Sequence, residues 1–298
     1  MLFRSHPALQ ECLQERQEPA AYLQLYTAGF TALVQQNALF TASEPPTDQL
    51  NRFQTALHQT LQDTAFRRSD PTGGSVETGW WELTVPPNPE LSPLADQVEM
   101  QIIRFLLKQP EESLTRLHQM LAQAFPGLLT PPANLIQAIL ESYAEPLPNT
   151  PETWRLQSQE LPSLRRNHIQ TAHKLLCHLG SRFGYTQSGN SPLLWLDQNG
   201  KPHYAFHIVA SSIISRFVYA PPPAPHNIIV LPGGRSNLLR FKLDRDPRLN
   251  RAAQNWQFLK FRHLRQLAER PDVTLEEWDR LLNADPPRWE KATQMTIF

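Results

Sequence analysis

The sequence predicts an α+β protein with a helical first half and a mixed α/β second half. Two observations support this prediction. Apolar residues recur at helical spacing in much of the first half, whereas the second half alternates short strand-like runs with helical patterns. Charge divides in the same way, because residues 1–150 hold 8 basic and 16 acidic residues and residues 151–298 hold 20 basic and 12 acidic residues. The overall charge of zero therefore conceals an acidic half and a basic half, and the basic half favours an acidic partner such as nucleic acid.

The composition argues against several other classes of protein. No apolar run approaches the roughly 18 residues of a membrane span, so we expect no membrane partner. The first residues lack a basic start followed by an apolar stretch, and we expect a cytoplasmic protein. Cys12 and Cys177 are 165 positions apart with no companions at metal-ligand spacing, which fits neither a disulfide framework nor a zinc site. We expect no metal and no cofactor.

Residues 1–79 are expected to form a helical N-terminal region. Apolar side chains between Pro19 and Ala42, and again between Gln49 and Phe66, follow the spacing of one helix face. The segment from 67 to 79 is polar and rich in turn-forming residues, so it ends this region.

Residues 80–160 are expected to form a small module with three helices. A short strand is predicted at 80–85, and three helical patterns then follow N-cap residues at Ser92, Ser113 and Thr130. With a further strand predicted at 153–156, this element order is typical of a winged helix.

The third of these helices bears on how such a module would act. Winged helices place one helix in the major groove, where Arg, Lys, Asn or Gln reach the base edges. Here the helix offers Asn134 and Gln137 but no Lys or Arg, and it carries Glu141 and Glu145. Groove binding and simple packing on a neighbour or partner protein therefore both remain open.

Residues 161–287 carry the basic excess. Between Arg155 and Arg265 there are 16 basic and 4 acidic residues. The patterns predict an α/β domain, with helices at 164–183 and 211–219, strands at 193–196, 204–209, 227–232 and 257–261, and further helices through Leu267 and Leu281. Cationic surfaces bind phosphates without catalytic groups. The candidate contacts to double-stranded DNA are the basic side chains Arg165, Arg166, Lys174, Arg182, Arg235, Arg240, Lys242, Arg245, Arg248, Arg251, Lys260 and Arg262.

Three segments of this domain resemble a known family. The run LLWLDQNGKPHYAFHIVASS at 193–212 looks like the central hairpin of PD-(D/E)xK restriction-endonuclease-like domains, and IIVLPGGR at 228–235 and WQFLKFR at 256–262 are similar to its later strands. Active members hold Mg²⁺ with an acid at the start of the hairpin and a Glu-x-Lys on its second strand.

The sequence departs from that catalytic pattern. Leu193 occupies the position of the first acid, and His207 and Val209 replace the Glu and the Lys. The resemblance therefore implies a nuclease-like fold that has lost its catalytic activity, and we predict no catalytic residues. The alternative is a metal-dependent nuclease whose carboxylates have moved, for example to Glu160 or Asp197.

The remaining tail, residues 288–298, suggests a protein partner. Its end resembles the short peptide by which bacterial DNA-processing proteins bind the replication sliding clamp, with Gln294, Met295, Ile297 and Phe298 as the contact residues. A further alternative is therefore a protein–protein adaptor recruited to the clamp.

The combined features resemble the regions that accompany bacterial DNA methylases of restriction-modification and phage-defence systems. The chain has no methylase motif of its own. The resemblance implies a non-catalytic, DNA-binding accessory protein whose partner is a separate methylase or helicase subunit.

Overall fold

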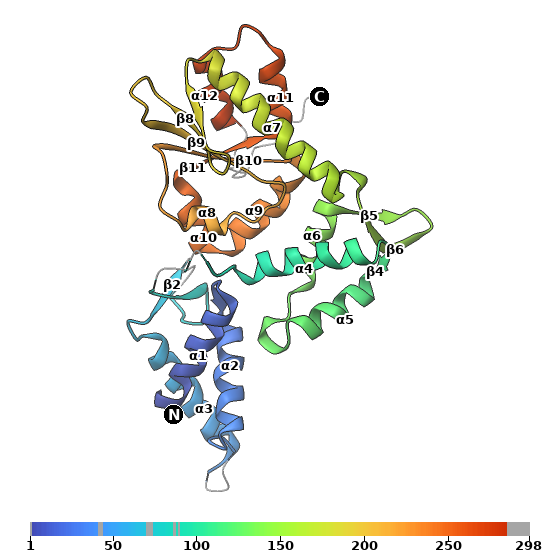
Figure 1. Cartoon of the computed structure of the whole chain (residues 1–298). Coiled ribbons are helices and arrows are strands. Elements are labelled where there is room, and N and C mark those ends of the chain that lie inside the picture. The colour runs from blue at the N-terminus through green and yellow to red at the C-terminus, as the bar shows by residue number, and fades with distance from the viewer. Residues whose placement is uncertain (1, 41–43, 70–73, 86–87, 89, 285–298) are drawn as a thin grey trace, which may run out of the picture.

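The computed structural model describes residues 2–40, 44–69, 74–85, 88 and 90–284, and it shows a mixed α+β chain, as predicted. Figure 1 shows three successive parts of the chain: a helical part drawn in blue, a second part drawn in green, and an α/β part drawn from yellow to red. Each part has an apolar core of its own, and further apolar residues fill the space between one face of the last sheet and its helices.

The N-terminal part consists of helices with a small sheet. Its elements are α1 (Leu2–Arg16), β1 (Ala20–Ala21), α2 (Tyr22–Gln35), α3 (Pro46–Leu61), β2 (Phe66–Ser69) and β3 (Trp80–Leu83). The predicted helices correspond to α2 and α3, and the predicted strand to β3. Helix α1 was not predicted as a separate element, and neither was the antiparallel sheet in which β3 lies between β1 and β2.

The middle part follows the order helix, strand, helix, helix, strand, strand. Its elements are α4 (Leu94–Lys108), β4 (Glu112–Ser113), α5 (Leu114–Ala124), a 3-10 turn at Gly127–Leu129, α6 (Ala133–Tyr143), β5 (Ala144–Leu147) and β6 (Thr150–Leu156). The predicted cap is confirmed at Ser113, whose Oγ accepts from Arg116 N at 3.2 Å. Ser92 and Thr130 were placed too early as caps, because α4 is preceded by Pro93 and α6 by Pro132.

The C-terminal part is a five-stranded sheet between helices, in the order β11-β10-β9-β8-β7. Its elements are α7 (Pro162–Arg182), β7 (Thr186–Ser188), β8 (Leu193–Leu196), β9 (Pro202–Ile208), α8 (Ser215–Val218), β10 (His226–Leu231), a 3-10 turn at Gly233–Arg235, α9 (Ser236–Arg245), α10 (Pro247–Ala252), a 3-10 turn at Ala253–Asn255, β11 (Trp256–Lys260), α11 (Phe261–Glu269) and α12 (Leu275–Ala284). The predicted helix at 211–219 shrinks to the single turn α8, and α9 and α10 were not predicted.

Strand directions in this sheet determine where a site can form. Strands β7, β8 and β9 form an antiparallel meander, whereas β9, β10 and β11 run parallel. Three carboxyl ends therefore meet at one edge, at Ile208, Leu231 and Lys260. In open α/β sheets this edge is where ligands usually bind.

Candidate anion-binding site

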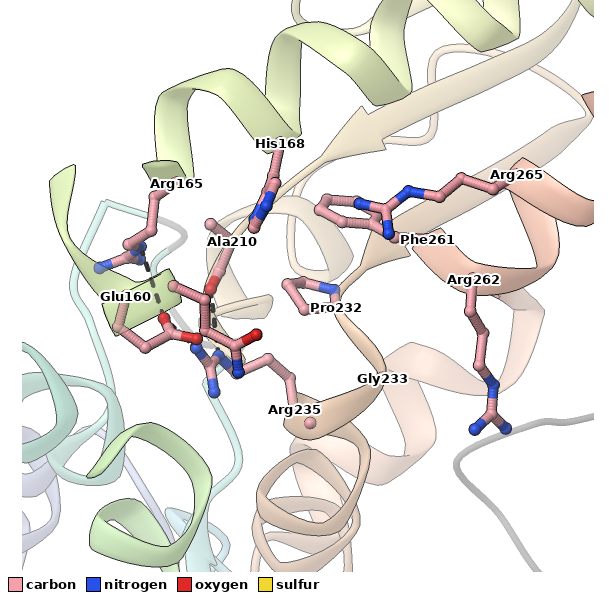
Figure 2. A pocket seen from close by; sticks show the side chains of 12 residues that line it. Glu160, Arg165, His168, Ala210, Pro232, Gly233, Arg235, Phe261, Arg262 and Arg265 are labelled. Carbon is pink, nitrogen blue, oxygen red and sulfur yellow. Dashed lines mark hydrogen bonds and ion pairs between the residues drawn. The ribbon is translucent and has the colours of Figure 1, made fainter. Parts of the chain in front are cut away.

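A recess of about 230 Å³ lies at this edge, beside the carboxyl ends of β9 and β10. It is bordered by the start of α7, the turn after β10 and the start of α11 (Figure 2). Its charged and ring-bearing lining consists of Glu160, Arg165, His168, Arg235, Phe261, Arg262 and Arg265. The lining therefore holds four arginines and one carboxylate, which gives the recess an excess of positive charge.

Arg235 forms the floor of the recess and is only 1% exposed. Its Nε donates to the carbonyl of Ala210 at 3.1 Å, its Nη1 donates to Ser142, and its guanidinium lies 3.5 Å from the ring centroid of Tyr143. Arg235 also forms an ion pair with Glu160. These contacts fix the guanidinium in one orientation and join the turn after β10 to α6.

Glu160, the single carboxylate of the recess lining, is already neutralised. Besides Arg235, it faces Arg165, whose Nε lies 3.9 Å from Glu160 Oε2. A buried carboxylate between two arginines favours an incoming anion over a cation, because the site has no spare negative charge with which to hold a metal.

The rim carries the more accessible cations. In Figure 2, His168 extends toward the recess from α7 and Arg265 extends toward it from α11, whereas the Arg262 side chain points away from Glu160. Gly233 and Gly234 line the wall without side chains, so a ligand can approach the backbone closely. Planar guanidinium groups on two sides suit the oxygens of phosphate or sulfate, which they can bind through two parallel hydrogen bonds.

The positions at which a metal-dependent nuclease needs acids lie in packed surroundings. Leu193 and Val209 are buried in the cores on the two faces of the sheet. His207 is 7% exposed between the rings of Phe217 and Trp256, at 4.5 and 5.2 Å. Burial, with Arg216 nearby, lowers the pKa of His207 to about 4, so its imidazole is neutral at pH 7.

Neither proposed replacement carboxylate lies in a metal site. Asp197 Oδ1 accepts from the backbone N–H groups of Asn199 and Lys201 at 2.8 and 2.9 Å, which is the turn role expected from its position. Glu160 is paired with arginines, as described above. Within the part of the chain that the structure describes, no three His, Cys, Asp or Glu side chains are grouped so that they could hold a metal ion.

Several of the predicted DNA contacts are buried in contacts between the three parts of the chain. Lys242 of α9 is 2% exposed, and its Nζ donates to Asp96 Oδ1 at 2.6 Å and to Glu99 Oε2. Glu99 also accepts from Ser212 N at 3.0 Å and from the hydroxyl of Tyr143. This Lys242 cluster joins α4 of the middle part to the C-terminal part.

The pKa directions in the Lys242 cluster follow from burial and pairing. Burial raises the pKa of Asp96, and the opposing pull of Lys242 does not fully offset it. Burial acts on Glu99 in the same direction, but Lys242 and three donated hydrogen bonds bring its pKa below the ordinary value. Lys242 itself has a raised pKa, since its two carboxylate partners outweigh its burial. Lys242 is therefore charged, and its ammonium group is bound by Asp96 and Glu99 within the protein.

A second buried cluster joins the N-terminal and C-terminal parts. Glu82 of β3 is fully buried and lies 2.5 Å from Arg251 Nη2 and 3.6 Å from Arg248 Nε. Close by, Arg245 Nη2 lies 3.9 Å from Glu18 Oε1. These arginines hold the parts of the chain together, and we do not assign them to DNA binding.

The remaining predicted DNA contacts differ in how exposed their side chains are. Arg166 and Lys174 are exposed on the outer side of α7, and Arg240 is exposed beside Asp244 in a different recess, between α6 and α9. Arg182 donates to the carbonyls of Arg270 and Pro271 at 2.8 and 2.7 Å. Lys260 is nearly buried at the end of β11, next to the recess.

Two residues of the recess were absent from the sequence-based candidates. Arg265 was counted only as the end of the basic region, and His168 was not among the candidate contacts. The spacing of Arg262 and Arg265 immediately after a strand was the available signal, because residues three apart share one side of a helix. His168 has no such signal, since its position depends on how α7 packs.

The helix expected to enter a DNA groove is partly covered. The hydroxyl of Ser142 in α6 donates to Gly234 O at 2.9 Å, and Leu238 of α9 belongs to the core of the middle part. Ala138 and Glu141 line the recess that α6 shares with α9. The C-terminal half of α6 therefore faces α9, whereas Asn134 is exposed and Gln137 is partly exposed.

The clamp-binding prediction, Gln294, Met295, Ile297 and Phe298, lies outside the described residues. Comparisons with protein-family models, with curated proteins and with solved structures find no match to this chain. Among the helices of the described residues, none is long and apolar enough to cross a membrane.

Proposed function

We propose that this protein binds nucleic acid through the phosphate backbone, without cleaving it, and that the recess at the sheet edge is the centre of the binding surface. The observation that carries this proposal is a recess lined by Arg165, Arg235, Arg262 and Arg265, whose one lining carboxylate, Glu160, is already paired with Arg165 and Arg235. Such a set of donors suits phosphate oxygens, which provide much of the affinity of proteins for DNA.

Further cations extend the surface beyond the recess. Arg166 and Lys174 are exposed on α7, eight residues and therefore about 80° of helix rotation apart. Helix α7 packs against α11, which carries Arg262 and Arg265. The two helices therefore add exposed positive charge to that of the recess.

The element order of the C-terminal part supports the nuclease-like interpretation of its ancestry. A helix, an antiparallel hairpin and parallel strands follow one another as in the resemblance described above. Where that family holds metal-binding acids, this chain has Leu193, His207 and Val209, and arginines gather at the same sheet edge. An ancestral cleavage site converted to phosphate binding accounts for both features.

The middle part fits a structural role within this proposal. Its element order and its sheet order β4-β6-β5 support the winged-helix interpretation, but the C-terminal half of α6 faces α9. We therefore assign this part to anchoring the C-terminal part, and not to reading bases in a groove. The partner would be double-stranded DNA in the cytoplasm, with a separate methylase or helicase subunit supplying any catalysis.

The proposal is tested by the anisotropy of a fluorescent 20-base-pair duplex titrated with protein at several salt concentrations. Removing two phosphate contacts with the double variant Arg262→Ala/Arg265→Ala should weaken binding at least tenfold and reduce the slope of log affinity against log salt by about 2. The matched control, Arg104→Ala/Lys108→Ala, removes the same charge from exposed positions of α4. Equal losses in both variants, or no binding of the duplex at low salt, would contradict the proposal.

A further inference from the structure

We propose that a second cleft, lined by α1, by the end of β3 and by Arg248 of α10, binds a small organic carboxylate with an apolar chain. This Arg248 cleft has a volume of about 480 Å³. Among the residues that the structure describes, it shares no lining residue with the recess at the sheet edge. Sites for small molecules usually have volumes of roughly 300–1,000 Å³, so the cleft is large enough for such a ligand.

The walls of the Arg248 cleft are apolar and come from segments that are far apart in the chain. They include Leu13 of α1, Ala65 before β2, and Leu83, Val85 and Leu91 at or after the end of β3. Val85 is 70% exposed and Leu91 is 48% exposed. An apolar chain lying between these side chains would remove both from water, which favours binding.

The cleft also holds one buried cation. Arg248 is 8% exposed and is the one basic residue among the described residues that line the cleft. Its Nε and Nη2 atoms are buried and donate no hydrogen bond to any residue that the structure describes. A buried donor without an acceptor costs free energy, and most such groups in proteins are therefore paired. An anionic oxygen beside this guanidinium would accept charge-assisted hydrogen bonds from it.

The carboxylates near Arg248 do not supply those hydrogen bonds. Glu82 Oε2 lies 3.6 Å from Arg248 Nε, and Glu82 Oε1 accepts from Arg67 Nε at 2.8 Å and from Arg251 Nη2 at 2.5 Å. Asp246 Oδ1 accepts from the backbone N–H of Arg248 at 2.9 Å, as the cap of α10. Three arginines and two carboxylates leave one positive charge unbalanced, which suits a ligand with one negative charge.

The rim of the cleft also favours a carboxylate over a phosphate monoester. Glu15 is exposed at the rim, where it would repel a dianion more strongly than a monoanion. A carboxylate carries a single charge, and its two oxygens match the planar fork of a guanidinium. The remaining polar side chains of the lining are neutral amides, from Gln10, Gln14, Gln17 and Asn88. The cleft therefore combines one site for a carboxylate with walls for an apolar chain.

Isothermal titration calorimetry of the full chain tests this proposal with three probes. Octanoate has both a carboxylate and an apolar chain, whereas 1-octanol lacks the charge and acetate lacks the chain. We expect octanoate to bind at least about tenfold more tightly than either, because a hydrogen bond to a charged group contributes about 1.5–3 kcal/mol. In Arg248→Gln, the preference for octanoate over 1-octanol should fall below about twofold, since the charge is lost and the walls remain.

A second variant keeps the test valid if Arg248→Gln fails to fold. Val85→Asp adds a negative charge at an exposed position of the cleft wall, and it should weaken octanoate binding at least about fivefold. The matched control Leu23→Asp adds the same charge on α2 at a side chain that is 72% exposed. Leu23 does not line the cleft, so this control should leave the affinity for octanoate unchanged.

The recess variant Arg262→Ala/Arg265→Ala separates the two sites and should bind octanoate as the unmodified protein does. Loss of octanoate binding in that variant would place the anion in the recess and overturn the proposal. Equal affinity for octanoate and 1-octanol, equal effects of Val85→Asp and Leu23→Asp, or no binding of octanoate would also overturn it. None of these results depends on whether the protein binds nucleic acid.

Discussion

The substitution Lys242→Met tests whether the Lys242 cluster holds the middle and C-terminal parts together. Methionine preserves much of the side-chain volume but removes the ammonium group that faces Asp96 and Glu99. Both carboxylates are at most 1% exposed, so they cannot regain the lost interaction from water. Breaking a buried ion pair costs about 3–5 kcal/mol, and we expect a loss of about 4 kcal/mol at pH 7.5.

The pH dependence of this loss distinguishes electrostatics from packing. Without Lys242, burial raises the pKa of both carboxyls in the folded state above their unfolded values, near 4. The folded state then binds more protons than the unfolded state above that pH, and the variant becomes less stable as the pH rises. The difference from the unmodified protein should therefore be largest at pH 7.5 and shrink as the pH falls toward 4.

Urea unfolding at several pH values measures these differences, with the exposed Lys108→Met on α4 as the matched control. A triple variant that adds Asp96→Asn and Glu99→Gln should recover at least about 2 kcal/mol, because neutral amides no longer leave buried charge uncompensated. A loss in Lys242→Met no larger than that in the control, or one independent of pH, would refute the assignment of Lys242 to a buried charge cluster.

Three further predictions concern buried groups and catalysis. The lowered pKa of His207, about 4 against 6.5, means that stability is lost as the pH falls from 6.5 to 4, and His207→Leu should remove about 3 kcal/mol of that loss in acid unfolding titrations; an unchanged acid profile would contradict this. Burial raises the pKa of Asp246 to about 7, so ionisation of this carboxyl makes the folded protein less stable as the pH rises from about 4 to 7. Asp246→Asn, which keeps a cap for α10, should be more stable by up to about 4 kcal/mol at pH 8 and equal below pH 4, and thermal melts that show no gain at pH 8 would rule this out. Incubation with plasmid and Mg²⁺ or Mn²⁺ should leave the plasmid intact, since His207 and Val209 stand where a nuclease needs Glu and Lys, and nicking that Asp197→Ala abolishes would instead support a relocated catalytic site.

Local patterns in the sequence predicted the elements that local interactions determine. The apolar run Leu193–Leu196 matches β8, and the β-branched run at 227–232 matches β10 to within one residue. Ser113 was recognisable as a cap because its partner is only three residues away. The two-residue strands β1 and β4 were not predictable in this way, since their partners are distant and they have no pattern of their own.

Counting basic residues in the sequence did not distinguish exposed cations from buried ones. Counting basic residues assigned the whole excess to one surface, but Lys242 pairs with carboxylates 143 and 146 positions earlier in the chain. One signal in the sequence did indicate its burial. Lys242 lies four residues after Leu238 and three after Leu239, on the apolar side of α9. Glu99 lies three residues before Ile102 and four before Ile103, on the apolar side of α4. A charged residue within an apolar stripe was therefore the sign in the sequence that the residue is buried.

The recess could be predicted only in part. Arg165, Arg235 and Arg262 were among the candidate contacts, but no pattern in the sequence separates them from nine other cations. Their placement around one recess depends on the parallel order of β9, β10 and β11 and on the packing of α7 against α11. The sequence therefore indicated the charge of the site, whereas the fold determines its location.

The most direct test of the central claim is a crystal structure of the full chain with a bound DNA duplex. We expect a backbone phosphate in the recess, within hydrogen-bond distance of Arg165 or Arg265. DNA bound elsewhere with an empty recess, for example against α5 of the middle part, would contradict it.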